Sequence, residues 1–343
     1  MPKKVSVAIL GSTGFVGLEL IKILSNHPNV NIDFFGTENN PNIFIKDIEP
    51  STNLPNNPQT TLNENFDYSS VDTVFLALPH GVSHKYVKLF FNKLQIIDLS
   101  ADFRLDDIET YKKNYNEKHS APNLLNEFLY GLAEINKDLL INKKNIAIPG
   151  CYPTSVLLPL TPLLQKNLIS TKNIIIDAKS GYSGAGKKFD LKNLKNSADL
   201  NFYNYNTNSH RHICEIRQEL RKYSKSSDIL FSFNPHILPN FRGMMSTIYC
   251  DLLPSINKKD VIKCLDEMAV KNQFISLVQS DRRVDFFSIQ NTNNCLIKIF
   301  DHYDSSKIII VSLIDNLIKG AAGQAVQCFN LSQGFEESTA LTK

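Results

Sequence analysis

The sequence lacks the features that mark membrane-spanning, exported or nucleic-acid-binding proteins. Its 343 residues hold no run close to the roughly 18 apolar residues of a transmembrane helix. Lys and Arg total 37 against 34 for Asp and Glu, and a surplus of +3 is too small to indicate nucleic-acid binding. The start, MPKKVSVAILGSTG, shows neither an apolar signal segment with a cleavage site nor a presequence rich in Arg and Ser. We therefore expect a cytoplasmic protein that binds neither membranes nor nucleic acid.

Paired cysteines are also missing. The six cysteines stand at 151, 214, 250, 264, 295 and 328, and no two form a Cys-x-x-Cys pair. Free thiols in a reducing compartment are the expected state. His210 and His212 form a His-x-His pair, but no third ligand follows at a recognised spacing, so we predict no metal ion.

The first part of the chain alternates between strand and helix patterns. Apolar runs at 5–10, 32–35, 74–78 and 96–99 predict strands, and Leu18 to Leu24 has helical spacing. Such alternation predicts a mostly parallel sheet with right-handed crossovers. Residues 39–65 are rich in Asn, Pro and Thr and are expected to form a surface excursion.

The pattern changes after residue 150. Closely spaced strands with fewer helices predict an α+β region with a mixed or antiparallel sheet. The predicted strands are 174–178, 229–233, 245–252, 295–300 and 308–313. Residues 261–270 and 315–331 are expected to be helical, and the small residues Gly320 to Gly323 permit close backbone approach. The last helix could return to pack on the first part of the chain.

A glycine loop follows the first strand. Residues 11–17, GSTGFVG, close the apolar run and open the first helix. Glycine at such a turn lets a pyrophosphate approach the backbone, and the helix N-terminus supplies N–H groups and a positive dipole end. The spacing GxxGxxG varies the common dinucleotide-binding pattern, and the alternative is a glycine turn without a ligand. The second strand ends at Glu38, which could accept from a ribose 2′-hydroxyl and so favour NAD.

Cys151 stands at a second strand–helix junction. It follows the strand-like residues 145–148 and precedes an apolar helical run at 156–164. A helix N-terminus stabilises a thiolate, which can attack a carbonyl carbon. The alternative is a buried structural thiol. A histidine that faces Cys151 could be the general acid/base, and His210 and His212 are both candidates.

Another glycine cluster, SGYSGAGK at 180–187, follows the predicted strand 174–178. Its backbone could approach a ligand closely. It is not a phosphate-binding loop of the nucleotide triphosphatase kind, because Lys187 is not followed by Ser or Thr.

These features in this order resemble the N-acetyl-gamma-glutamyl-phosphate reductase family of arginine biosynthesis, which is related to aspartate-semialdehyde dehydrogenase. The resemblance covers almost the whole chain, and PGCYPTS and HRHICEI carry its most specific parts. The matching segments are GSTGFVG at 11–17, ALPHG at 77–81, DLSADFR at 98–104, YGLAEI at 130–135, PGCYPTS at 149–155, SGYSGAGK at 180–187, HRHICEI at 210–216, PHILPNFRGM at 235–244 and DNLIKGAAGQAVQ at 315–327.

The resemblance implies a Rossmann-like dinucleotide-binding domain of residues 1–150 plus 316–343, and a catalytic and dimerisation domain of residues 151–315. It implies an NADPH-dependent reductase in which Cys151 forms a thioester with the substrate and His212 is the acid/base. His210 and three arginines that suit carboxylate and phosphate, Arg104, Arg211 and Arg242, are expected to bind the substrate. The residues expected to contact NADP are Gly11, Ser12, Thr13, Gly14, Phe15, Val16, Gly17, Ser180, Gly181, Gly184, Ala185 and Asn316. A homo-oligomer, dimer or tetramer, is the expected assembly.

Two other functions are compatible with parts of this pattern. The same chemistry could act on another acyl phosphate, such as aspartyl phosphate. A non-catalytic dinucleotide-binding redox sensor would explain the glycine loop, but it gives no reason for PGCYPTS or the histidine pair.

Overall fold

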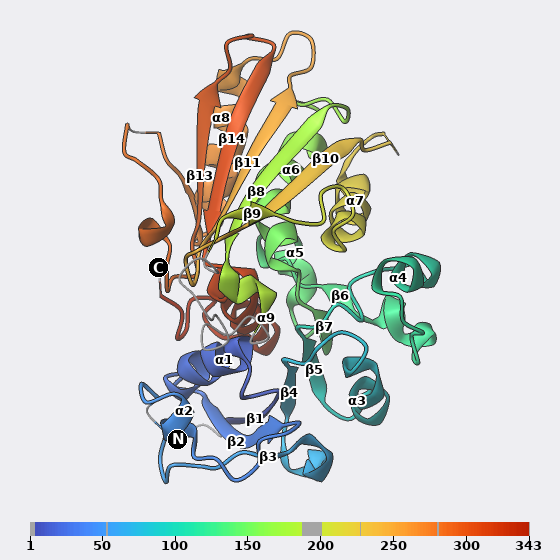
Figure 1. The fold of residues 1–343 in the computed structure, drawn as a ribbon, viewed down its shortest axis with the longest axis vertical. Helices are drawn as coiled ribbons and strands as arrows, with labels where there is room; N and C mark the ends of the chain where they lie inside the picture. The colour runs from blue at the N-terminus through green and yellow to red at the C-terminus, as the bar shows by residue number, and fades with distance from the viewer. Residues whose placement is uncertain (1–3, 53, 187–200, 227, 280, 343) are drawn as a thin grey trace. The chain divides into compact units, whose positions relative to one another are not determined.

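The computed structural model describes residues 4–52, 54–186, 201–226, 228–279 and 281–342, which form two compact units. The first unit runs to Pro149 and includes Ala321–Thr342, and the second is Gly150–Gly320. Figure 1 labels the elements of both. Among the described residues, none of the helices is both long and apolar enough to cross a membrane.

The first unit is built on a parallel sheet. Its described strands follow the order β3-β2-β1-β4-β5-β7-β6, and every neighbouring pair is parallel. The strands are β1 (Val5–Leu10), β2 (Val30–Thr37), β3 (Thr61–Leu62), β4 (Thr73–Leu76), β5 (Gln95–Asp98), β6 (Leu129–Tyr130) and β7 (Asn145–Ala147). The helices are α1 (Phe15–Ser25), α2 (Ile45–Ile48), α3 (Ser83–Phe90), α4 (Ile108–Tyr115), α5 (Ala133–Leu140) and α9 (Gly323–Gln333).

Helices cover both faces of this sheet. Val7 and Ile9 of β1 belong to a core with α1, α5 and α9, whereas Ala8 and Leu10 pack into a core with α3 on the other face. A strand buried on both sides is continuously apolar, which is why residues 5–10 were recognisable in the sequence. The chain order reverses at β1, which lies between β2 and β4, and such a switch point opens a crevice at the carboxyl ends of the strands.

The second unit contains a mixed sheet in the order β12-β13-β14-β11-β8-β10-β9 over the described residues. The pairs β8–β10 and β12–β13 are parallel, and the others are antiparallel. The strands are β8 (Ile174–Gly181), β9 (Tyr203–Asn204), β10 (Phe231–Leu238), β11 (Met244–Asp251), β12 (Ile275–Leu277), β13 (Cys295–Asp301) and β14 (Lys307–Ile314). The helices α6 (Cys151–Gln165) and α8 (Lys258–Lys271) lie on one face of the sheet, and α7 (His212–Tyr223) packs beside α6.

The other face of the second sheet carries an apolar row across four strands. Register aligns Phe300 with Ile309, Ile309 with Tyr249, and Tyr249 with Ile175. Ile175 is 49% exposed and Phe300 39% exposed. On the same face, near the start of β11 and the end of β14, a cluster that includes Phe286 covers Met245, Leu296 and Leu313. We call Phe300, Ile309, Tyr249 and Ile175 the open row.

The fold class predicted from the sequence is confirmed: an α/β unit with a parallel sheet precedes a unit with a mixed sheet. Several predicted bounds were off by a few residues, and two differences have a clear physical reason. The strand predicted at 229–233 lies at Phe231–Leu238, because Pro235 is tolerated where the neighbouring strand β9 is only two residues long. The helix predicted at 315–331 begins at Gly323, because Asp315 accepts the N–H groups of Leu317 and Ile318 and a π-helical turn follows.

Candidate active site

The glycine loop turns sharply at the carboxyl end of β1. Gly11 has φ +87°, and a Cβ there would lie 2.2 Å from the Ala77 carbonyl oxygen. A Cβ at Gly17 would lie 2.2 Å from the Gly11 carbonyl oxygen. Both positions therefore require glycine, the first because of its φ and both because of close backbone approach. Ser12 is buried and donates its hydroxyl to the Gly36 carbonyl, so its side chain ties β1 to β2.

The start of α1 is open to an anion. Gly14 is the N-cap, no side chain caps the helix, and no acidic residue stands in its first turn, which begins at Phe15, Val16 and Gly17. A Cβ at Gly14 would meet only the Gly11 carbonyl oxygen, at 3.5 Å, so the space before the loop is clear. An uncapped helix N-terminus at a switch point fits a dinucleotide pyrophosphate.

The end of β2 lies next to this loop. The Thr13 and Thr37 hydroxyls are 3.2 Å apart, and the exposed Glu38 accepts from Asn63 at 3.1 Å. Glu38 therefore stands where a ribose would meet a carboxylate. Among the described residues, Glu38 contacts Asn63, and the Thr37 hydroxyl contacts Thr13 and the Asn40 N–H, so neither side chain has a Lys or Arg partner there.

Cys151 is the first residue of α6. Of the six cysteines, all of them in described segments, five are buried and Cys151 is partly exposed. Its helix has Gly150 as N-cap, without a capping side chain or an acidic residue in the first turn. Cys151 thus stands at the positive end of the helix dipole, a position that in general stabilises a thiolate. By contrast, burial raises the pKa of Cys214 and of Cys250 to about 12.

A buried carboxyl group joins the start of α6 to the start of α7. The Gly150 N–H donates to Glu215 Oε1 at 2.9 Å, and Glu215 is fully buried in the first turn of α7. His212 is the first residue of α7. The nucleophile candidate Cys151 and the acid/base candidate His212 therefore begin two helices. The hydrogen bond between Gly150 and Glu215 holds the starts of these helices together.

Two tyrosines and His210 surround this junction. The Tyr205 hydroxyl lies 3.4 Å from that of Tyr152 and 3.5 Å from His210 Nε2, and the His212 N–H donates to His210 Nδ1 at 3.1 Å. The rings of His210 and His212 are 4.7 Å apart. Burial raises the pKa of Tyr205 to about 12, and the adjacent Cys151 charge contributes to that shift and to a raised pKa of Tyr152. Tyr152, Tyr205 and His210 therefore form one group of contacts beside the start of α6.

The protonation state of His210 follows from its surroundings. Burial, with a further effect of the Arg211 charge, lowers the pKa of His210 to about 4. The ring is therefore neutral near pH 7, and because Nδ1 accepts a hydrogen bond, its proton is on Nε2. His210 fixes the backbone at His212, and the predicted contact between His210 and substrate stays a prediction.

The three candidate arginines lie in different settings. Arg104, in the first unit, donates from Nε to the Ile148 carbonyl at 2.6 Å and from Nη2 to the Leu99 carbonyl at 2.8 Å. Arg242 donates to Asn291 and forms an ion pair with the buried Asp315 at 3.3 Å. Arg211 is exposed at the N-terminus of α7. Arg211 is thus the arginine that the structure brings next to the histidine pair.

Asn316 connects the second glycine cluster to the start of β11 by hydrogen bonds. Asn316 accepts from the Gly243 N–H at 2.8 Å and donates to the Ser183 hydroxyl at 2.9 Å. A Cβ at Gly181 would lie 2.6 Å from the Phe241 carbonyl oxygen, so close packing requires this glycine. Ser180 is buried, whereas Gly184 and Ala185 are exposed at the tip of the loop. Lys187 lies outside the described residues.

Two site residues were missed in the sequence, Tyr205 and Gly320. Tyr205 meets the Cys151 region only through the fold and has no local signal, whereas Glu215 belongs to the HRHICEI motif and only its contact with Gly150 was unforeseen. Gly320 lies against the nucleophile, since a Cβ there would be 2.7 Å from Cys151 Cβ. The small residues around Gly320 did predict close approach, but they did not reveal what approaches.

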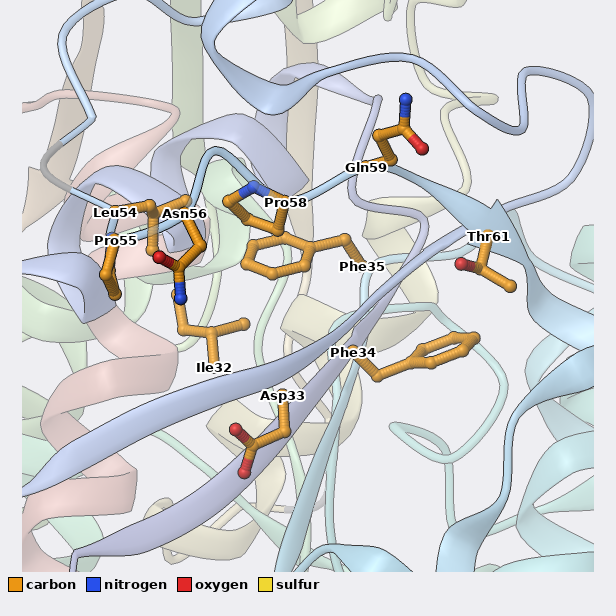
Figure 2. A pocket seen from close by; sticks show the side chains of 10 residues that line it. All are labelled: Ile32, Asp33, Phe34, Phe35, Leu54, Pro55, Asn56, Pro58, Gln59 and Thr61. Carbon is orange, nitrogen blue, oxygen red and sulfur yellow. The ribbon is translucent and has the colours of Figure 1, made fainter.

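A pocket beside β2 lies apart from the glycine loop. It has a volume of about 320 Å³, and Figure 2 shows its lining side chains, from Ile32 to Phe35 on the strand and from Leu54 to Thr61 on the following segment. Its one acidic side chain among the described lining residues, Asp33, accepts from the Ser6 hydroxyl. A dinucleotide crosses the carboxyl ends of strands, beyond this pocket, so we assign no ligand to it.

Both units match one class of enzyme domains. Residues 6–143 match the model of the semialdehyde dehydrogenase NAD binding domain, and residues 151–316 match that of the semialdehyde dehydrogenase dimerisation domain. The fold is that of aspartate semialdehyde dehydrogenase II from Vibrio cholerae, with a TM-score of 0.73 at 20% identity over 96% of this chain and 98% of that one. The first unit is thus a nicotinamide-dinucleotide-binding domain of semialdehyde dehydrogenase type.

Similarity in sequence identifies the family within this class. N-acetyl-gamma-glutamyl-phosphate reductase from Ehrlichia canis is 40% identical over 100% of this chain and 99% of its own length. The probable chloroplastic N-acetyl-gamma-glutamyl-phosphate reductase of Arabidopsis thaliana is 36% identical over 99% of this chain and 84% of its own length. The chain belongs to the N-acetyl-gamma-glutamyl-phosphate reductase family.

Proposed function

We propose that this chain catalyses the NADPH-dependent reduction of N-acetyl-gamma-glutamyl phosphate to N-acetylglutamate 5-semialdehyde and phosphate, in arginine biosynthesis. The observation that carries the proposal is the partly exposed Cys151 at an uncapped helix start, tied through Gly150 to the helix that begins at His212. Family membership supports the substrate. The free thiols favour a reducing compartment, and we propose the cytoplasm.

Cys151 supplies the nucleophile. Its thiolate attacks the γ-acyl carbon, the carbon–sulfur bond forms, and the carbon–oxygen bond to phosphate breaks, so inorganic phosphate leaves and a thioester remains. The α6 dipole stabilises the thiolate before attack. After reduction, the carbon–sulfur bond breaks, and the aldehyde and the Cys151 thiolate are released.

The first unit holds the cofactor. The α1 N–H groups behind Gly14 would bind the pyrophosphate, and Thr13 and Thr37 would face the adenosine ribose. Bound there, the reduced nicotinamide supplies the hydride that takes the thioester to the aldehyde level. We further propose that Ser180, Gly181, Gly184, Ala185 and Asn316 belong to the cofactor site.

His212 manages the proton on the reacting oxygen and sulfur. It accepts the thiol proton before attack, donates a proton to the substrate oxygen when the thiohemiacetal forms, and takes that proton back when the thiohemiacetal collapses. Arg211 stands beside both histidines with an exposed guanidinium suited to a carboxylate or phosphate. Arg104 and Arg242 keep their proposed roles in anion binding, although their guanidinium groups also bond to protein atoms.

The reverse reaction tests substrate and cofactor together. The purified protein is expected to reduce NADP when given phosphate and N-acetylglutamate semialdehyde, and to be much less active with aspartate semialdehyde. NADP is expected to exceed NAD in kcat/KM, although Glu38 suits the 2′-hydroxyl of NAD. Absorbance at the nicotinamide band measures all four combinations. A preference for aspartate semialdehyde would support the alternative reductase. A higher kcat/KM with NAD than with NADP would reverse the cofactor choice. The absence of any phosphate-dependent activity would favour the redox sensor.

We also propose that the open row of the second sheet joins two copies of the chain. An exposed apolar row across four strands suits a self-complementary interface, and residues 151–316 match a dimerisation domain. Burying a glutamate in such an interface without a partner costs several kcal/mol. Ile175→Glu is therefore expected to shift the protein to a monomer in light scattering after size-exclusion chromatography.

The matched control is Val270→Glu. Val270 is 82% exposed on α8, on the helical side of the sheet, so this change introduces the same charge away from the open row. It should leave the assembly intact. An Ile175→Glu protein with the wild-type mass would show that the copies meet elsewhere.

A further inference from the structure

Two carboxyl groups are completely buried at the carboxyl end of β5. Asp98 ends the strand, Asp102 follows four residues later, and both have no exposed surface. Asp98 accepts from the Ser100 N–H at 3.0 Å and from the Ser100 hydroxyl at 2.8 Å. Asp102 Oδ1 accepts from the Gly81 N–H and from the Tyr111 hydroxyl, each at 2.8 Å, whereas Asp102 Oδ2 is buried without a partner among the described atoms.

The pair cannot carry two charges without a large electrostatic cost. Burial, together with the Asp102 charge, raises the pKa of Asp98 from 3.8 to about 7. Buried carboxyl groups whose charges interact in this way resist a second ionisation, because it would place like charges in a medium of low dielectric constant. A proton kept by the pair would also add a donor to a group in which the Asp102 Oδ2 atom has no partner within the described part of the chain.

Other titratable groups face the pair from neighbouring elements. They include Tyr111, whose pKa burial raises, and His119, whose pKa burial lowers, so both are neutral near pH 7. His119 Nε2 lies 2.9 Å from the Asp102 carbonyl. A Cβ at Gly81 would overlap the Glu117 carboxyl, so a third acidic side chain stands close by. The groups around the pair are Tyr111 and Tyr115 on α4, Glu117 and His119 after it, and His84 and Lys88 on α3.

The carboxyl pair is connected to the glycine loop. A chain of hydrogen bonds runs from Asp98 through the Ser100 hydroxyl to the Asp102 N–H, and the Asp102 carboxyl holds the Gly81 N–H. Gly81 ends the loop 77–81 that follows β4, and the Ala77 carbonyl of this loop packs against Gly11. The pair therefore supports the strand-end loop beside the proposed pyrophosphate site.

We propose that Asp98 and Asp102 share one proton, and that this proton holds the loop 77–81 in the arrangement that binds the dinucleotide. Both aspartates are positioning residues, since they act through Gly81. The inference rests on the proposed cofactor site. Loss of the proton puts a second negative charge beside the first, separates the two loops and weakens dinucleotide binding.

The sign of the pH effect follows from the raised pKa. Between the ordinary value of 3.8 and about 7, the folded chain keeps a proton that the unfolded chain has released. Stability from this pair is full below about pH 4 and is lost as pH rises through about 7. Dinucleotide affinity is expected to fall as pH rises above about 7, where the folded chain itself loses the proton.

The test measures NADP binding by calorimetry on the full chain at about pH 6.5 and about pH 8.5. One linked proton changes affinity by at most about tenfold per pH unit, and we expect a loss of about three- to tenfold in the wild type. Asp98→Asn removes the second charge at every pH and should vary by less than about twofold. Asp138→Asn, an exposed aspartate on α5, is the control and should follow the wild type. Equal wild-type affinity at both pH values, or a wild-type loss in Asp98→Asn, would overturn the proposal.

A second readout does not require the cofactor. The thermal midpoint of the wild type should fall between about pH 5 and about pH 8, and that of Asp98→Asn or Asp102→Asn should fall less. If neither variant folds, amide hydrogen exchange of the loop 77–81 is measured in the wild type and corrected for the intrinsic exchange rate. The corrected rate is expected to increase at pH values above about 7, and a constant rate refutes the shared proton. A chain that shows the thermal effect but binds no NADP at either pH would refute the cofactor assignment and leave the shared proton standing.

Discussion

Cys151→Ser is expected to fold normally and to lose more than about a thousandfold in kcat. A serine hydroxyl is almost wholly protonated near pH 7, and the helix dipole cannot lower its pKa far enough to make it a comparable nucleophile. The side-chain volume hardly changes, so packing against Gly320 is preserved. Phosphate-dependent NADP reduction measures activity, and thermal unfolding checks the fold.

Cys214→Ser is the matched control. Cys214 lies near the start of another helix, α7, and donates its Sγ–H to the Arg211 carbonyl, a hydrogen bond that serine can make. Burial holds the pKa of Cys214 at about 12, so its thiolate is negligible at neutral pH. The variant should keep most of the activity. If Cys151→Ser retained a tenth of the wild-type turnover, the nucleophile would have to be sought elsewhere.

His212→Asn is expected to lower kcat by about 10²–10⁴-fold and to flatten the acid limb of its pH profile. A neutral imidazole can accept the thiol proton, whereas a protonated imidazole at low pH cannot. Asparagine keeps a polar side chain of similar size at the start of α7, but it cannot transfer the proton. The pH dependence of kcat, measured in both variants and the wild type, is the deciding readout.

His210→Asn separates the two histidines. Burial lowers the pKa of His210 to about 4, so its replacement should leave the limb near neutrality unchanged. Its effect is expected mainly on KM, as for a residue that binds or positions substrate. An unchanged profile in His212→Asn would move the acid/base role to another group, and reduced thermal stability with normal profiles in both variants would mean that the pair only shapes the loop.

Part of the candidate site was predictable because it is local in the chain. The buried strand before Gly11 and the apolar helix after Cys151 place both residues at helix starts, and the orientation of the helix dipole follows from position alone. The contacts of Arg104 and Arg242 were not predictable in this way, since their partners Ile148 and Asp315 lie 44 and 73 residues away.

By itself, the sequence determined the alternation of elements, the fold class, the two helix-start sites and the family resemblance. These depend on apolar periodicity, on glycine where backbone atoms meet, and on motifs of contiguous residues. Only the tertiary structure decided that Glu215 holds Gly150 across 65 residues, that His210 is buried and neutral, and that Asp102 holds Gly81 beside Asp98. The physical reason is that the order of the strands determines which loops lie next to each other. Burial of side chains between those loops then determines which of their titratable groups are charged.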